Sequence, residues 1–211
     1  MAAPVPPGTL PAGFELVAGW VPGAEAAELF THLREVVPWE HKRVLVFGKE
    51  HPVPRLTCWF GPSAYSYSGS TNEAHPITSI PALEDLRQHL ESFTGASFNS
   101  LLANYYRDGR DSMGWHSDDE VELGPSPTIA SVSLGAARDF HLRPRGGGPV
   151  VRARLGGGDL LVMSGRSQMD WQHSLPKRAA SEPRINLTYR LFDPRAPASE
   201  GLQLGAEAPA P

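Results

Sequence analysis

Two segments in the first half of the chain have apolar residues at the three-to-four spacing of an amphipathic helix. The first segment begins near Pro22 and stops at Pro38, and its apolar stripe is Leu29, Phe30, Leu33 and Val36. The second begins at Pro81 and ends at Gly95, a residue suited to closing a helix. Its stripe is Leu83, Leu86, Leu90 and Phe93. The pattern therefore predicts two helices.

Beyond Gly95 the pattern changes to short strands separated by glycine- and proline-rich turns. The predicted strands are 99–106, 128–134, 139–142, 150–155, 159–163 and 184–192. Many short strands after two helices indicate a mostly β (α+β) fold, either a sandwich or a jelly roll, with the helices buttressing one sheet.

The last predicted strand is polar on one face. Alternation places Arg184, Asn186, Thr188 and Arg190 on one side, and Ile185, Leu187, Tyr189 and Leu191 on the other. Two arginines on a strand inside a domain are costly unless an anion meets them. We therefore expect this face to bind an acid.

Length and composition indicate one globular domain over residues 14–194. The chain has 211 residues, of which 40% are hydrophobic. Residues 1–13 and 195–211 are rich in proline, alanine and glycine and are expected to be disordered tails. With no long apolar run, no signal-peptide pattern and a lone Cys58, we expect a soluble protein, cytoplasmic in a bacterium or nuclear in a eukaryote.

The net charge of -4 argues against a globally basic surface for nucleic acid. Basic residues nevertheless cluster locally, at Arg43, Lys49 and Arg55, at Arg138, Arg143, Arg145, Arg152 and Arg154, and at Lys177 and Arg178. Such clusters are either scattered solvated side chains or phosphate contacts, and charge alone does not separate the two.

His116, Asp118 and His173 are the candidate metal ligands. His116 and Asp118 lie two apart on an extended segment, and His173 joins them from another strand. Two histidines and one carboxylate on one face of an octahedron leave neighbouring positions open, which suits non-haem Fe(II) with a co-substrate and O₂. A bare His-x-Asp is a weak signal by itself.

The two arginines of the polar strand indicate an organic acid that would bind the metal. A 2-oxoacid that chelates iron leaves a far carboxylate to be neutralised, and a guanidinium fork does this well. Arg184 is a candidate for either carboxylate, and Arg190 for the other. Asn104 and Tyr106, two apart on a strand, offer an amide and a phenol to the same acid, although this segment also reads as core aromatic packing.

Together these motifs resemble the AlkB-type dioxygenases, which depend on 2-oxoglutarate and Fe(II) and reverse alkylation damage on nucleobases. The resemblance runs from about 44 to 192 and is closest to the branch that acts on double-stranded DNA. It implies a double-stranded β-helix in which His116, Asp118 and His173 hold iron and are catalytic. Arg184 would meet the near carboxylate of 2-oxoglutarate and Arg190 the distal one. The implied 2-oxoglutarate set is Asn104, Tyr106, Arg184, Asn186, Thr188 and Arg190.

The resemblance also implies a nucleotide-recognition segment at about 41–75 and further substrate-binding residues. Tyr65 and Tyr67 would stack on an extruded base, although the segment also reads as a hairpin with exposed tyrosines. Glu120, and less clearly Asp119, would face a positively charged methylated base, although acidic residues in a turn are usually just solvated.

A short hydrophobic finger is implied at Val46, Phe47 and Gly48, with Phe47 as a wedge in the base stack. The residues alone read as a buried strand over 44–47. Arg55, with Arg43 and Lys49, would contact phosphates.

We therefore expect oxidative demethylation of 1-methyladenine and 3-methylcytosine in DNA, using Fe(II), 2-oxoglutarate and O₂. The partner would be methylated duplex DNA with a flipped base, the protein a monomer, and no membrane would be involved. The same chemistry on RNA, single-stranded DNA or a protein side chain stays open, as does a non-catalytic metal-binding jelly roll.

Overall fold

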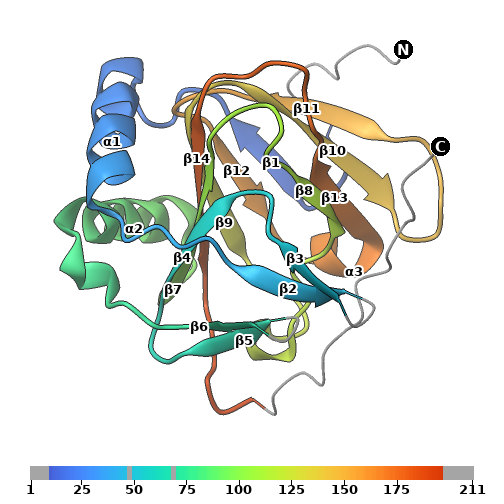
Figure 1. The fold of residues 1–211 in the computed structure, drawn as a ribbon. Helices are drawn as coiled ribbons and strands as arrows, with labels where there is room; N and C mark the ends of the chain where they lie inside the picture. Colours follow the sequence, from blue (N-terminus) through green and yellow to red (C-terminus); the bar gives the residue numbers. More distant parts are fainter. Residues whose placement is uncertain (1–9, 47–48, 68–69, 197–211) are drawn as a thin grey trace.

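Two antiparallel sheets face each other and form most of the molecule (Figure 1). The computed structural model describes residues 10–46, 49–67 and 70–196. The larger sheet has the order β1 (Phe14–Val17), β12 (Leu160–Met163), β9 (Ile129–Gly135), β14 (Arg184–Arg190), β7 (Ser100–Tyr106) and β4 (Leu56–Phe60). The smaller has the order β11 (Val151–Leu155), β10 (Arg138–Pro144), β13 (Trp171–Leu175) and β8 (Met113–His116). This confirms a mostly β jelly-roll fold.

Helices α1 (Gly23–Val36) and α2 (Pro81–Thr94) lie on the outer face of the larger sheet, as predicted (Figure 1). Pro81 begins α2, where its missing N–H costs no hydrogen bond. Gly95 closes it at φ 70, a left-handed conformation that favours glycine. Helix α1 ends at Val36, because the next residue is already extended ahead of Pro38. Shorter helical turns are η1 (Ile77–Ser79), η2 (Val121–Leu123) and α3 (Ser167–Asp170).

The main hydrophobic core lies between the larger sheet and the two helices. Ile185, Leu187 and Tyr189 of β14 are fully buried in it, and the Tyr189 hydroxyl donates to the Leu83 carbonyl at 2.9 Å. Because side chains alternate along a strand, this burial turns Arg184, Asn186, Thr188 and Arg190 toward the space between the sheets. Because the apolar face of β14 packs outward against the helices, its polar face lines the space between the two sheets.

Three apolar residues were wrongly expected to be buried. Leu191 is 53% exposed because β14 ends one residue earlier, at Arg190. Val36 and Phe93 are 43% and 49% exposed, each in the last turn of its helix, and Phe93 meets Trp20 edge-on at a centroid distance of 6.1 Å.

Strands β4 and β1 were not predicted from the sequence. Strand β4 is buried along most of its length, so its sequence shows no alternation of polar and apolar residues. Strand β1 is only four residues long. The segment 41–75 contains two hairpins, β2 (Arg43–Val46) with β3 (Lys49–Pro52) and β5 (Tyr65–Tyr67) with β6 (Ser70–Asn72).

The folded part begins slightly earlier than expected. Leu10 packs against the smaller core cluster around Phe14 and Leu161, and the Gly13 carbonyl accepts from the Ser164 N–H at 2.8 Å. The predicted N-terminal tail therefore does not extend to residue 13. No helix among the described residues combines the length and apolar character needed to cross a lipid bilayer.

Candidate active site

A cavity of about 250 Å³ lies between the two sheets and brings most of the predicted site residues together. From the smaller sheet and the loop after β8 come His116, Asp118 and His173. From the larger sheet come Asn104, Tyr106, Arg184, Asn186, Thr188 and Arg190. All nine residues predicted for metal and 2-oxoglutarate therefore line one cavity.

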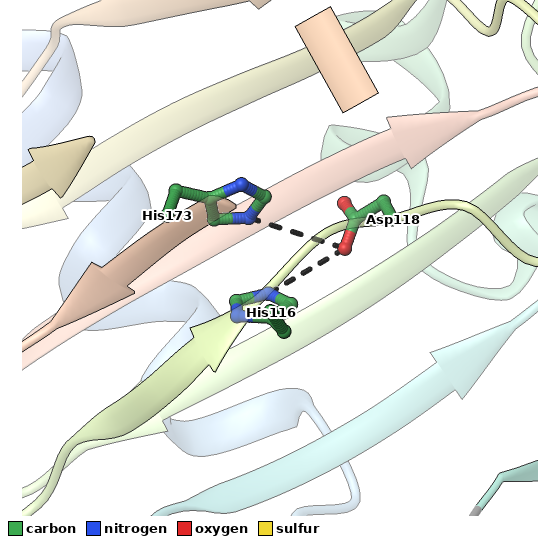
Figure 2. A group of neighbouring side chains, drawn as sticks. All are labelled: His116, Asp118 and His173. Carbon is green, nitrogen blue, oxygen red and sulfur yellow. Dashed lines mark ion pairs between the residues drawn. The ribbon is translucent and has the colours of Figure 1, made fainter. Parts of the chain in front are cut away.

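The three candidate metal ligands converge at one point (Figure 2). His116 on β8 and His173 on β13 are register partners across neighbouring strands. Their Nε2 atoms lie 3.5 Å and 4.0 Å from the same oxygen, Oδ1 of Asp118. Ligand atoms bind a transition metal at about 2.0–2.2 Å, so an ion between these atoms would reach all three.

The protonation states also suit a metal. Burial lowers the pKa of both imidazoles, that of His173 to about 3, so both rings are neutral at pH 7 and offer a lone pair. The Nδ1 atom of His116 lies 3.0 Å from the Gly114 carbonyl, and a hydrogen donated there leaves Nε2 free for the metal. His173 stacks against Phe140 at a centroid distance of 5.2 Å, which fixes its ring.

Asp118 is a buried carboxylate whose charge is balanced by Arg190. Burial alone would raise the pKa of Asp118, but the Arg190 guanidinium beside it holds this pKa below its usual range. Arg190 Nη2 donates to Oδ2 at 2.8 Å, which leaves Oδ1 facing the histidines. Two neutral imidazoles and one ionised carboxylate form a donor set that fits Fe(II).

Arg184, at the other end of β14, is a buried cation whose hydrogen-bond acceptors in the described part of the chain are neutral. Its guanidinium donates to Ser133 Oγ at 2.7 Å and to the Leu155 carbonyl at 3.0 Å, and its side chain is almost fully buried. Its Nε is buried and has no hydrogen-bond partner among the described residues. Burial lowers its pKa to about 10, so it stays charged at pH 7. A cation in this position favours an anionic ligand in the cavity.

The two arginines of β14 stand at opposite ends of the strand. Because a strand rises about 3.3 Å per residue, six residues separate the Cα atoms of Arg184 and Arg190 by about 20 Å. Arg190 contacts a metal ligand, whereas Arg184 bonds to β9 and β11. Arg190 therefore lies at the metal end of β14 and Arg184 away from it, an arrangement that favours Arg190 for the near carboxylate and Arg184 for the distal one.

Between the arginines, polar side chains are held by their neighbours. Thr188 donates to Asn186 Oδ1 at 2.9 Å, and Asn186 Nδ2 donates to Ser131 Oγ at 2.7 Å. Ser131 and Ser133 were missed as site residues. Their only signal was a pair of serines two apart within an otherwise apolar strand, Ile129–Gly135.

Arg55 was expected at the DNA backbone, and the structure contradicts this. Its side chain is buried, lines the cavity, and donates from Nε to Asn104 Oδ1 at 2.7 Å. A guanidinium buried at the cavity wall does not reach a phosphate on the outside. Arg55 therefore belongs to the interior of the site.

The other predicted substrate residues divide into three groups. Glu120 lines the cavity, as expected. Asp119 is exposed and pairs with Arg145, so it does not line the cavity with Glu120. Phe47 and Gly48 lie outside the described residues, as do the side chains of Val46, Tyr65 and Tyr67, whose backbones form hairpin strands.

Comparisons with known proteins agree with this geometry. Residues 13–190 match the model of the 2OG-Fe(II) oxygenase superfamily. The alpha-ketoglutarate-dependent dioxygenase alkB homolog 3 of Rattus norvegicus is 43% identical over 202 residues, covering 90% of this chain and 68% of its own length. The DNA oxidative demethylase ALKBH2 of Homo sapiens is 44% identical over 179 residues, covering 79% of this chain and 69% of its own length.

The solved structure of OsALKBH1 superposes with a TM-score of 0.59 at 18% identity and covers 86% of this chain and 99% of its own, which supports the fold. The family model and the relatives each cover most of the residues that form the two sheets and the cavity between them. The matched residues include the three candidate metal ligands and the two buried arginines of the cavity, and the chain belongs to the 2OG-Fe(II) oxygenase superfamily and, within it, to the AlkB family.

Proposed function

We propose that this oxygenase removes methyl groups from 1-methyladenine and 3-methylcytosine in DNA. One methyl group, one 2-oxoglutarate and one O₂ would give the repaired base, formaldehyde, succinate and CO₂. The observation that carries the proposal is the cavity, in which three metal ligands from one side face two buried arginines from the other. Relatives named as an AlkB homologue and a DNA oxidative demethylase support the substrate class.

His116, Asp118 and His173 would hold the iron. Bound iron supplies the coupling between oxidative decarboxylation of 2-oxoglutarate and hydroxylation of the methyl group. The protein contributes orientation and charge matching within the cavity. The hydroxyl of the resulting hydroxymethyl group then loses its proton to solvent, the C–N bond breaks to release formaldehyde, and the nitrogen of the base keeps the electron pair of that bond.

The two arginines would orient 2-oxoglutarate from its two ends. Arg190 lies beside Asp118 and would meet the carboxylate near the metal. Arg184 would pair with the distal carboxylate, because its guanidinium is the buried cation at the far end of β14 and has only neutral partners in the described structure. Tyr106 and Asn104, on the neighbouring strand β7, lie opposite Arg184 and Asn186 and would contact the acid near the Arg184 end.

The methylated base would enter from the side of the segment 41–75. This segment supplies Lys42, Val53, Arg55 and Thr57 to the cavity wall, together with Asn72, and its hairpins lie beside each other (Figure 1). Glu120 also lines the cavity. The bases 1-methyladenine and 3-methylcytosine carry a positive charge, whereas unmodified bases are neutral. A carboxylate at the cavity wall therefore favours these lesions.

The test is demethylation of matched oligonucleotides. Anaerobically iron-loaded protein is mixed with 1-methyladenine or 3-methylcytosine in single-stranded DNA, duplex DNA or RNA, and loss of the methyl mass is followed with and without 2-oxoglutarate. We expect loss that requires 2-oxoglutarate and is fastest on DNA. A greater rate on RNA would reassign the substrate, and no loss on any polymer would refute the proposal.

Phe47 gives the test of strand preference. Replacing it with alanine is expected to slow demethylation of duplexes more than that of single strands, because only a duplex needs a wedge to replace the extruded base. An equal effect on both substrates would remove the wedge from the proposal.

A further inference from the structure

The backbone N–H of Asp118, in the turn after β8, lies beyond the end of the strand and cannot be paired by its β-ladder. Strand β8 ends at His116, so Asp118, two residues later, has left the hydrogen-bonded ladder. Asp118 is nevertheless only 3% exposed. A buried N–H needs an acceptor, and an unmet one is costly. The Asp118 N–H donates to Oε1 of Gln168 at 2.9 Å, across fifty positions in the sequence.

Gln168 is itself held firmly in place. Its side chain is 1% exposed and extends from the single-turn helix α3. Its amide nitrogen lies 3.2 Å from Ser167 Oγ and 3.5 Å from Met163 Sδ. These contacts occupy the donor end of the amide and leave the oxygen to face Asp118. The acceptor is therefore oriented by contacts within the protein.

The same segment carries the second histidine. Helix α3 runs directly into β13, which holds His173. A second hydrogen bond follows the same route, since Ser117 Oγ donates to the Trp171 carbonyl at 2.8 Å. Residues 167–173 thus fix the position of the turn that bears Asp118 relative to His173, in the cavity where the two side chains meet.

We propose that Gln168 is a positioning residue for the metal centre: it fixes the backbone at Asp118 so that the carboxylate faces both imidazoles. This inference rests on the metal site of the proposed function. Residues behind the direct ligands typically change metal affinity by about 10–100-fold when they are replaced. The Gln168 side chain does not line the cavity, so it acts through Asp118 and not on a substrate.

The experiment measures Co(II) binding to the intact metal-free chain, without substrate. Gln168→Met has a similar volume and no amide oxygen, and Gln172→Met is the matched control. Gln172 lies on β13 and accepts from Arg143 Nε at 3.0 Å, with no contact to Asp118 among its described hydrogen bonds. We expect Gln168→Met to weaken Co(II) binding about tenfold or more and to alter its visible absorption bands, whereas Gln172→Met binds Co(II) like the unaltered chain.

Two further measurements separate positioning from general stability. Urea unfolding of the metal-free variants measures how much each glutamine contributes to stability. A loss of stability alone does not change the Co(II) absorption spectrum of the protein that remains folded. If Gln168→Met does not fold, Gln168→Asn, which keeps an amide but shortens its reach, carries the same expectation. Unchanged Co(II) affinity and spectrum in a folded Gln168 variant would overturn the inference. Failure of the unaltered chain to bind Co(II) would instead refute the metal site.

Discussion

Arg184 offers the sharpest test of how the cavity holds its co-substrate. The guanidinium is buried and charged, and within residues 10–46, 49–67 and 70–196 its hydrogen-bond acceptors are the neutral oxygens of Ser133, Leu155 and Ala136. A hydrogen bond that involves a charged group contributes about 1.5–3 kcal/mol, and each 1.4 kcal/mol is about a factor of ten in affinity. We expect Arg184→Met to weaken 2-oxoglutarate binding by at least about a hundredfold, because a fork makes two such bonds.

A comparison of two acids isolates the carboxylate that Arg184 binds. The molecule 2-oxopentanoate has the same carbon chain as 2-oxoglutarate with a methyl group in place of the distal carboxylate. The unaltered chain should prefer 2-oxoglutarate by about the factor lost in Arg184→Met, and that variant should have almost no preference. Arg190→Met should weaken both acids alike, because the near carboxylate is common to them. Arg184→Lys should recover part of the affinity, since it keeps the charge but not the fork.

The assay is calorimetric titration of each acid into Mn(II)-loaded protein without O₂, with succinate formation as a second readout. Arg138→Met is the matched control. Arg138 is equally buried, and it donates to the backbone carbonyls of Asp111 and Pro176, but it does not line the cavity. The Arg138→Met variant should be less stable than the unaltered chain and should bind 2-oxoglutarate with the same affinity. If Arg184→Met still discriminates between the two acids as the unaltered chain does, the distal carboxylate is bound elsewhere.

Three further predictions concern the metal, the thiol and acid stability. His116→Ala should abolish 2-oxoglutarate turnover, measured as succinate, while urea unfolding shows that it still folds. Burial raises the pKa of Cys58 to about 12, so the native thiol should resist iodoacetamide at pH 8 and react only on unfolding; rapid native labelling would contradict its burial. Hydrogen bonds from Arg87 lower the pKa of Glu84 from 4.5 to about 2. Its contribution, about 0.5–1 kcal/mol after solvent screening, is present above pH 4.5 and is lost as the pH falls toward 2. The difference in unfolding free energy between the unaltered chain and Glu84→Gln should therefore shrink between pH 6 and pH 3.

The local sequence pattern was sufficient to predict a strand or helix, and the orientation of its side chains, where the element has one apolar and one polar face. The alternation in β14 predicted which side chains enter the core and which enter the cavity, because burial of Ile185, Leu187 and Tyr189 fixes the orientation of the whole strand. The helices followed from spacing and from Pro81 and Gly95. Strand β4 escaped because a strand buried on both faces shows no period.

The interior role of Arg55 was not accessible from local pattern. Three basic residues near a hairpin look alike in sequence, whether they face solvent or the interior. Arg55 immediately precedes β4 and lies beside β7, and only that pairing brings it to Asn104. Gln168 is similar, because a glutamine in a short turn gives no sign that a backbone N–H fifty residues away depends on it.

The order of the two arginines shows what spacing can and cannot determine. Six residues along a strand fix how far apart Arg184 and Arg190 stand, but the metal ligands belong to the opposite sheet. Which end of β14 faces them depends on how the two sheets pack, a relation between segments that neither segment encodes alone. The hydrogen bond from Arg190 to Asp118 settles the direction, because an ionised carboxylate buried with two neutral imidazoles requires a cation beside it. One arginine is thereby committed to the metal end, and the other is left as the buried cation that can select a dicarboxylate.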